Sequence, residues 1–238
     1  ALIEGLREAE RIGVNPYTFG FIGSTDTHLG NPGDVRERSH IGSFGESAEE
    51  SLTIGTQKRP SAFTSAGGLA GVFAEENSRE AIFDALVRRE AFATSGTRIA
   101  PRFFAGWNLP EGVCERGDLV AAGYAGGVPM GGTLPKRASP DAKLRFYVAA
   151  QGDPESAPLQ RIQIIKASYG SDGLFHQAVH DVAVSASSTP VDATSCAIRA
   201  EGPAAMCATW SDPEFDPARA AVYYARVVES PTCRWTTW

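Results

Sequence analysis

The chain has 238 residues, of which 42% are hydrophobic and 21% charged, and its formal net charge is -6. This composition is that of an ordinary folded protein with room for one or two domains, and it excludes intrinsic disorder. The acidic balance offers no basic surface to a nucleic-acid backbone, and no apolar run approaches the length of a membrane span. The sequence therefore predicts a soluble protein that binds neither nucleic acid nor membrane.

Both ends of the sequence are unusual for a complete polypeptide. There is no initiator Met and no signal-peptide pattern, and the first residues already form an amphipathic helical pattern in which Leu2, Ile3 and Leu6 share one face. The last residues, 234–238, are bulky and aromatic. We therefore interpret the chain as a piece of a longer protein.

After the opening helix the sequence predicts a short strand and then a long loop. Residues 17–23 form an apolar run that is typical of a buried strand. Residues 29–70 are rich in Gly, Ser and charge and show almost no periodicity. Because structureless connections of this length are uncommon in compact domains, we expect an active-site loop or lid here.

A strand, a helix and another strand follow. The strands are expected at residues 72–74 and 91–94. Between them, Asn77 and Glu80 have the spacing of a capping box, which marks the start of a helix. This order of elements is typical of a parallel α/β arrangement.

The second half has a different texture, from about Ile99 onward. Its apolar runs alternate in the β manner and are separated by turn-forming residues, with no convincing helix between them, and the Gly-rich segment 123–132 is expected to be a loop. The predicted strands are 101–107, 144–150, 162–168, 177–185, 205–210 and 222–228. This pattern favours an antiparallel sandwich. We therefore expect an α+β protein whose first domain covers residues 1–98, followed by a β-rich, sandwich-like domain over residues 99–238.

The four cysteines do not form a Cys-x-x-Cys site. They are Cys114, Cys196, Cys207 and Cys233. Cys196 and Cys207 are close enough in sequence to pair across a local loop, which would suit an exported protein. The alternative is that the cysteines are buried free thiols. Spacing alone leaves both interpretations open.

The clearest chemical signal comes directly after the predicted strand at 17–23. Asp26 and His28 stand two residues apart in the sequence Gly-Ser-Thr-Asp-Thr-His. In an extended backbone alternate residues share a face, so both side chains are expected to point to one place at the end of the strand. A carboxylate and an imidazole suit zinc, manganese or iron, and such ions lower the pKa of bound water. The alternative is an Asp turn cap beside an exposed His.

This motif also carries a resemblance to a known superfamily. Residues 20–28 (GFIGSTDTH) resemble the late Asp-x-His motif of the PHP (polymerase and histidinol phosphatase) metallohydrolases. The wider chain resembles a bacterial relative of that superfamily, a domain of unknown function, over residues 18–30, 71–107, 123–132 and 204–235. The resemblance implies a distorted β/α barrel with two or three divalent metal ions, two of whose ligands are Asp26 and His28. It implies hydrolysis of phosphoesters or, as in the branch similar to carbaryl hydrolases, of carbamate esters.

The early motifs of that superfamily are absent from this chain. Only four histidines are present, and none belongs to the His-x-His pair of the first barrel strand. We therefore expect residues 1–98 to be the C-terminal segment of an incomplete PHP-type barrel, whose N-terminal remainder supplies the other metal ligands. By itself the chain is predicted to be catalytically inactive.

Three further residues are candidates for contact with a small-molecule substrate. Glu75 and Arg98 each follow a predicted strand, and Arg98 offers a bidentate grip on an anionic group. His40 lies in the long loop that would overhang the barrel mouth. The alternatives are that Glu75 supports a helix N-terminus, that Arg98 forms a salt bridge at the domain junction, and that His40 is an exposed loop residue.

The other two histidines, His176 and His180, stand four residues apart. On a helix they would share a face, but the surrounding valines and Gly173 favour a strand. A solvated strand face is therefore favoured over a metal site at these positions.

Two functional hypotheses follow from the sequence. The first is a metal-dependent hydrolase in which metal-activated water attacks a phosphoester, carboxylic ester or carbamate. The alternative is a non-catalytic β-sandwich binding module with a degenerate barrel. A serine hydrolase is not supported, because the sequence has no Gly-x-Ser-x-Gly elbow. A periplasmic or secreted location is expected from the potential disulfide and from the resemblance.

Overall fold

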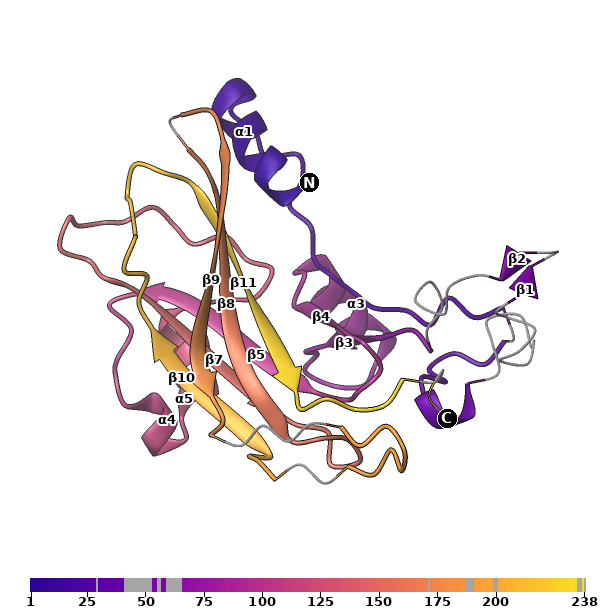
Figure 1. Cartoon of the computed structure of the whole chain (residues 1–238). Coiled ribbons are helices and arrows are strands. Elements are labelled where there is room, and N and C mark those ends of the chain that lie inside the picture. Colours follow the sequence, from indigo (N-terminus) through magenta and orange to yellow (C-terminus); the bar gives the residue numbers. More distant parts are fainter. Residues whose placement is uncertain are drawn as a thin grey trace.

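Two antiparallel sheets dominate the protein (Figure 1). The computed structural model describes residues 1–28, 30–40, 53–54, 57–58, 66–170, 172–186, 191–198, 201–234 and 237. The first sheet contains, in spatial order, β10 (Ala205–Trp210), β7 (Leu144–Gln151), β5 (Ala100–Trp107) and β6 (Val128–Pro129). The second sheet contains, in spatial order, β11 (Ala221–Glu229), β8 (Leu159–Tyr169) and β9 (Phe175–Val184).

The hydrophobic core lies between these two sheets. Phe103, Phe146 and Val148 of the first sheet belong to the same buried cluster as Ile162 and Ile164 of the second. The rings of Phe103 and Phe146 stack with their centroids 5.7 Å apart. Alternate residues of each strand contribute to this cluster, as expected for sheets that face one another. The six strands predicted for the second half are confirmed, and the arrangement is sandwich-like.

Two short helices cover the outer face of the first sheet. Helix α4 (Val113–Arg116) and helix α5 (Leu119–Gly126) pack on Phe104 and Tyr147, which are buried on that face. The predictions that this region lacks helices and that residues 123–132 form a loop are therefore wrong. A Cβ on Gly123 would lie 2.6 Å from Cγ of Phe104, so the glycine lets the helix approach the strand closely.

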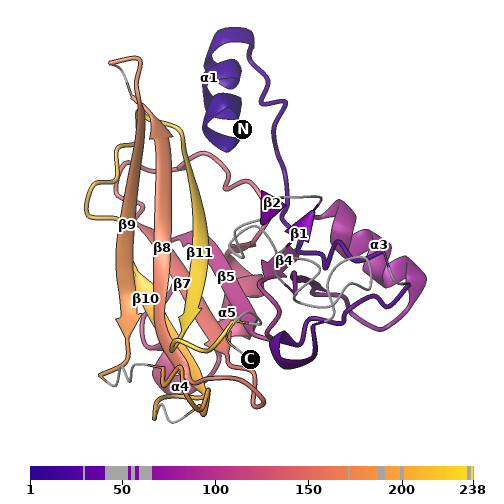
Figure 2. The same cartoon turned by 45° about the vertical axis from the view of Figure 1, so that its right-hand side comes forward.

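Helix α1 (Leu2–Ile12) confirms the predicted opening helix and lies against the second sheet, where it contacts β8 and β11 (Figure 2). It ends at Gly13, whose φ of 79° is the left-handed conformation common at helix C-termini. On β8, Ile165 and Ala167 are buried although they point away from the core between the sheets. The molecule is therefore layered as helices, sheet, sheet and helix.

A pair of strands lies to one side of the sheets (Figure 2). We call this pair the hairpin, although a helix joins its two strands. Strands β3 (Leu69–Val72) and β4 (Ala91–Thr94) flank helix α3 (Arg79–Val87), which confirms the predicted order, but β3 lies at 69–72 rather than at the predicted 72–74. However, the strands are antiparallel, so the parallel arrangement expected from their order is wrong. The connection that contains α3 leaves β3 and enters β4 at the same end of the pair, where the N–H of Phe73 donates a hydrogen bond to the carbonyl of Glu90. A parallel pairing would need the chain to return along the whole strand first.

The start of α3 differs by one residue from the prediction. Ser78, rather than Asn77, is the N-cap residue, and its Oγ accepts a hydrogen bond of 3.2 Å from the N–H of Ala81. Ser78 has extended backbone dihedrals, which suit an N-cap residue. The sequence predicted correctly that a capping residue starts the helix, but placed this residue one position too early.

Residues 17–23 do not form the buried strand that was predicted. The segment is not part of a sheet, and Phe19, Phe21 and Ile22 are 49%, 52% and 62% exposed. The segment runs beside the β3–β4 pair, where a Cβ on Gly20 would lie 3.1 Å from Cβ of Arg89, but among the described residues it pairs with no strand. Apolar composition alone therefore did not produce burial here.

About half of the long stretch 29–70 lies outside the described residues, and the expected loop or lid stays a prediction, although residues 69–70 belong to β3. Its described parts include a short 3-10 helix, η1 (Glu37–Ser39), and the pair β1 (Thr53–Ile54) and β2 (Gln57–Lys58).

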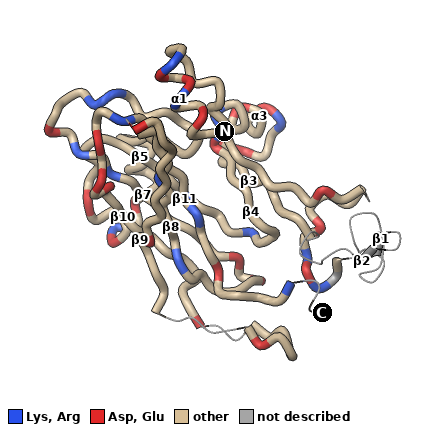
Figure 3. The backbone as a smooth tube through the Cα atoms, turned by 45° about the horizontal axis from the view of Figure 1, so that its top comes forward, with Lys and Arg blue, Asp and Glu red and all other residues tan. Residues whose placement is uncertain are grey.

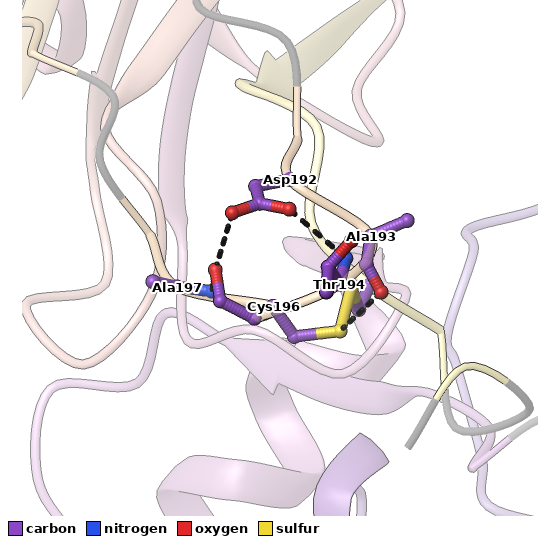
Figure 4. Close-up of a disulfide and its surroundings, with 7 residues drawn as sticks. Asp192, Ala193, Thr194, Cys196 and Ala197 are labelled. Carbon is purple, nitrogen blue, oxygen red and sulfur yellow. Dashed lines mark hydrogen bonds between the residues drawn. A yellow bond between two sulfur atoms is a disulfide. The ribbon is translucent and has the colours of Figure 1, made fainter.

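Two disulfides are present, and both differ from the Cys196–Cys207 pair that the sequence left open as one alternative. Cys114 of α4 is bonded to Cys207 of β10, and Cys196 is bonded to Cys233 near the C-terminus (Figure 4). The alternative of free thiols is also wrong. Cys207 pairs across the ladder with Ala149, which packs against the α4 cluster, so Cys207 faces α4. The face of β10 on which Cys207 lies, rather than nearness in sequence, determines that its partner is Cys114.

A polar network joins the hairpin to the first sheet. Tyr124 of α5 donates a hydrogen bond to the buried carboxylate of Glu90, and Arg102 of β5 donates to the hydroxyl of Tyr124. The guanidinium carbon of Arg102 lies 3.3 Å from the ring centroid of Phe73. The described residues contain no closed barrel, so a PHP-type barrel segment over residues 1–98 stays a prediction, as does the domain boundary at residue 98.

Candidate functional site

The loop that carries Asp26 and His28 rests on one end of the β3–β4 hairpin. The carbonyl of Ser24 accepts a hydrogen bond of 2.8 Å from the N–H of Gly68. A Cβ on Gly23 would lie 2.7 Å from the carbonyl oxygen of Leu69, and a Cβ on Gly67 would lie 2.4 Å from the Cα of Thr25. Neither contact leaves room for a side chain. The glycines therefore hold this loop in direct backbone contact with the hairpin.

Asp26 has an unusual backbone conformation within that loop. Its φ of 54° is in the left-handed region, which residues other than glycine rarely adopt. Hydroxyls hold the loop on both sides, because the Oγ1 atoms of Thr25 and Thr27 are 3.2 Å apart and the N–H of Asp26 lies 3.4 Å from Oγ of Ser24. Such strain persists where the surroundings enforce it, and it is concentrated at functional sites.

The side chains of Asp26 and His28 are both exposed. The left-handed conformation of Asp26 interrupts the extended backbone that was predicted for residues 26–28. The two side chains therefore do not share a face by simple alternation. Whether both bind one ion remains a prediction, to be tested by experiment.

Arg98 and Glu75 lie at opposite ends of the hairpin. Thr94 pairs with Leu69, so Arg98, which follows β4, lies at the end that carries the Asp26 loop. Glu75 follows Val72 and lies at the other end. The carboxyl ends of parallel strands would have met at one edge, but the antiparallel pairing separates them. Of the two, Arg98 follows the end of β4 that lies beside the Asp26 loop, and its backbone N–H contacts Asp153.

The remaining sequence candidates have ordinary surroundings. Glu75 is exposed three residues before the N-cap of α3, where a negative charge favours the helix. His40 follows η1 and is half-buried.

His176 and His180 lie on β9, which confirms the predicted strand, but the predicted solvated face is wrong for His180, which is half-buried. Nε2 of His176 is 3.0 Å from the Asp172 carboxylate, and the ring of His180 lies 4.8 Å from that of Trp210. Hydrogen bonding to His176 is the main cause that lowers the pKa of Asp172. Within the described part of the chain, no three His, Cys, Asp or Glu residues are arranged to hold a metal ion.

The sequence did not indicate a cluster of carboxyl groups that lies beside Arg98. The Oδ2 atom of Asp153 accepts a 2.8 Å hydrogen bond from the N–H of Arg98, and Oε2 of Glu229 accepts one of 3.2 Å from Ser156. Burial, together with the charge of Asp153, raises the pKa of Glu229 to about 7. The only sequence signal was the Gly-Asp-Pro turn around Asp153. Glu229 ends an unremarkable strand and gave none.

A second unexpected cluster lies at one end of the space between the sheets. Nζ of Lys166 and the hydroxyl of Tyr223 each donate a 2.6 Å hydrogen bond to Oδ2 of Asp212. Burial opposes ionisation of Asp212, but these bonds and one from the Glu214 N–H outweigh it and lower the pKa. Burial, aided by the bond to Asp212, raises the pKa of Tyr223 well above its ordinary value. Long-range pairing brought these residues together, so sequence spacing gave no hint of them.

Comparisons with known proteins identify a family but no function. A family model described as "Protein of unknown function (DUF3604)" matches residues 1–238. No curated protein and no solved structure matches the chain. In the described residues, no helix is both long and apolar enough to cross a bilayer.

Proposed function

The chain belongs to the DUF3604 family, whose function is unknown, and from this premise we propose that it is part of a metal-dependent hydrolase of the PHP type. Asp26 and His28 are the metal ligands that it contributes. When bound, zinc, manganese or iron supplies Lewis acidity and lowers the pKa of the water that attacks a phosphoester, carboxylic ester or carbamate.

The observation that carries this proposal is the construction of the Asp26 loop. A carboxylate oxygen and an imidazole nitrogen are suitable donors for these ions. They are exposed on a loop whose backbone is held by contacts at Gly23, Gly67 and Gly68, so little ordering is needed when a ligand binds. Asp26 has a left-handed backbone conformation that glycine would adopt more easily. The presence of Asp there therefore fits a role for its side chain.

Exposed apolar side chains in the region around the β3–β4 pair favour contact with additional polypeptide. Besides residues 19–22, helix α3 exposes Phe83 and Val87 by 63% and 59%. Exposed apolar surface of this kind usually marks a contact with another protein element. We propose that the missing part of a β/α barrel packs here and brings the remaining ligands of a site for two or three ions. The chain alone would then be inactive.

Arg98 is the residue of this chain that we assign to substrate binding. It lies at the hairpin end that carries the Asp26 loop, and a guanidinium can bind an anionic group with two hydrogen bonds. Its position suits a small anionic substrate. The two disulfides agree with the proposed export to the periplasm or the exterior, because disulfides persist in oxidising compartments.

Metal analysis tests the proposal. A longer family member that contains this segment should retain two or more metal ions after dialysis, and Asp26→Ala/His28→Ala should lose at least one of them. Asp172→Ala/His176→Ala is the matched control, since it removes an exposed Asp–His pair elsewhere and should leave the metal content unchanged. Equal metal content in all three proteins would disprove the assignment of the ligands.

Activity provides the second part of this test. The metal-loaded longer protein should hydrolyse an aryl phosphoester, ester or carbamate, and the Asp26→Ala/His28→Ala variant should not. A longer protein that binds no metal under metal-replete conditions would leave the binding-module hypothesis as the better account.

The binding-module hypothesis is favoured by one observation, the pocket at the end of the two sheets. That pocket is lined by side chains from β8, β9 and β11 and by the loop that follows β10. It does not include either predicted metal ligand.

A further inference from the structure

The pocket lies where the apolar space between the sheets ends. Its volume is about 290 Å³, at the lower end of the range for small-molecule sites. The residues that line it are Lys166, Ser168, His176, Gln177, Ala178, Glu214, Asp216, Arg219, Ala221 and Tyr223.

The strand register explains why the core stops here. Along β8, Ile164 pairs with Ala225 and belongs to the apolar core, while Lys166 pairs with Tyr223 and Ala178 two residues further. Residues paired directly across an antiparallel ladder share a face, so the inward-facing layer changes from apolar to polar within one step. Ala178 has a small side chain at this position and leaves space beside Lys166. The pocket is therefore built by the inward faces of three strands.

The polar groups in this layer are costly for the fold. The side chain of Asp212 is fully buried and that of Lys166 is 12% exposed. A buried ion pair usually contributes less stability than apolar residues of similar size would. Polar residues that replace apolar packing beside an open pocket fit a role in binding a ligand. Lys166 donates two hydrogen bonds within the protein, to Asp212 and to the carbonyl of Glu214, and an ammonium has three protons to donate.

The charges around the pocket largely cancel. Lys166 is paired with Asp212, and Arg219 with Asp216 at 3.2 Å. Glu214 adds a negative charge, but its side chain is exposed and screened by water. An anion would meet two carboxylates here, and a cation would meet two charged bases. Acidic and basic positions are also interspersed along the surrounding strands and loops (Figure 3).

We propose that this pocket binds a neutral, polyhydroxylated molecule of monosaccharide size. Hydroxyl groups both donate and accept hydrogen bonds, as does the side chain of Ser168, which lines the site and shares the inward face with Lys166. The ring of Tyr223, whose centroid lies 4.6 Å from that of Phe146, forms an apolar floor continuous with the core. The proposal does not depend on the metal site, because the pocket contains neither Asp26 nor His28.

Titration with simple sugars tests the proposal. The methyl glycosides of glucose, galactose and mannose are added to the ¹⁵N-labelled chain, and amide shifts are followed by NMR. At least one sugar should shift amides of β8, β9 and β11 around the pocket, with a dissociation constant on the order of 1 mM. Inorganic phosphate and methylamine are the charged comparison probes. If no sugar binds, or if either charged probe binds more tightly than the sugars, the proposal is wrong.

Three variants locate the binding. Ala178→Leu fills the pocket and should weaken sugar binding roughly tenfold or more. Val179→Leu is the matched control, because Val179 is the next residue on β9, points to the opposite face and is exposed. Glu214→Gln removes a charge from the rim and should change the affinity for a neutral sugar by less than about threefold. Unchanged binding in Ala178→Leu, with the NMR spectrum otherwise preserved, would overturn the assignment to this pocket.

Discussion

Apolar side chains are buried between the two facing sheets, but many remain exposed in the first hundred residues. Phe146, on β7, is 2% exposed, whereas Phe21, in the segment before the Asp26 loop, is 52% exposed. Both lie in apolar stretches that predict a strand. The difference is that β7 has neighbours on both edges and a second sheet across the core, while residues 17–23 have no such partner in the described part of the chain.

This contrast shows that an apolar pattern gives burial only where a partner element is present. It also separates the two proposed sites. The Asp26 loop belongs to the sparsely packed region and is held by backbone contacts with glycines. The pocket belongs to the densely packed region and is held by a buried ion pair.

The largest expected effect comes from truncating one phenylalanine in each region. Phe146→Ala should lower the free energy of unfolding by about 3–5 kcal/mol, because it opens a cavity in the core. Phe21→Ala should lower it by less than about 0.5 kcal/mol, as expected for an exposed residue. Urea denaturation of both variants measures the difference. Similar losses would show that Phe21 is packed in solution and that the contrast between the regions is wrong.

Removing the disulfides should have the next largest effect. The Cys114–Cys207 bond spans 93 residues and the Cys196–Cys233 bond spans 37. Because a longer loop restricts the unfolded chain more, replacing the first pair by Ser should cost about 4.6 kcal/mol and replacing the second about 3.8 kcal/mol. Denaturation under oxidising conditions checks this order. A larger loss from the second pair would mean that contacts of the C-terminal segment, and not chain entropy, dominate.

The network between the hairpin and the first sheet should contribute a smaller amount. Tyr124→Phe deprives the buried Glu90 carboxylate of its hydroxyl donor and should lower the free energy of unfolding by about 2 kcal/mol. Burial and the bond to Glu90 raise the pKa of Tyr124, so its hydroxyl stays protonated at neutral pH. The double variant Tyr124→Phe/Glu90→Gln should recover part of the loss. An additive loss in the double variant would contradict the proposed coupling.

Glu229 should make stability depend on pH. Its pKa is raised to about 7 in the folded protein from an ordinary value of 4.5, so the folded state holds the proton more tightly. This contribution is fully present below pH 4.5 and is lost as pH rises through 7. Glu229→Gln should therefore be more stable than the wild type at pH 8, by about 1 kcal/mol after allowance for solvent screening of the partly exposed carboxyl.

Denaturation at pH 5 and pH 8 measures this effect. Glu214→Gln, at an exposed position, is the control and should show the pH dependence of the wild type. A steeper loss of stability with rising pH in Glu229→Gln would contradict the assignment.

The smallest expected effect concerns the strain at Asp26. Replacing it by glycine relieves a left-handed conformation at a gain of about 1 kcal/mol, but glycine also gains freedom in the unfolded chain at a cost of about 0.5 kcal/mol. Asp26→Gly should therefore be more stable by about 0.5 kcal/mol, while losing metal. Asp26→Asn should match the wild type in thermal unfolding, because Asn tolerates this conformation. A destabilised glycine variant would show that the Asp26 side chain supports the fold.

The sequence by itself predicted the elements of the second half closely. Residues 205–210 form the expected strand with its predicted bounds, and the other five strands differ only at their ends. Period-two alternation and turn residues are local properties, so they survive into the fold. The same local reasoning found α1, β4 and the helix α3. It failed at Gly123, because a glycine that breaks an isolated helix can also serve close packing against Phe104.

The candidate site was predictable only in part. The position of Asp26 and His28 after an apolar run was visible in the sequence, and so was Arg98 at the end of a strand. The carboxyl cluster at Glu229 and the group of Lys166, Asp212 and Tyr223 were not visible, because their members are far apart in the chain and meet through strand pairing.

Sequence alone determined where the six long strands of the second half and helices α1 and α3 form, since periodicity, caps and turn residues act within a few residues. Tertiary structure alone decided the antiparallel pairing of β3 with β4, which places Arg98 and Glu75 at opposite ends of the hairpin. It also decided which cysteines pair, and it created the pocket between the sheets. Strand direction and register depend on long-range packing, which no local pattern encodes.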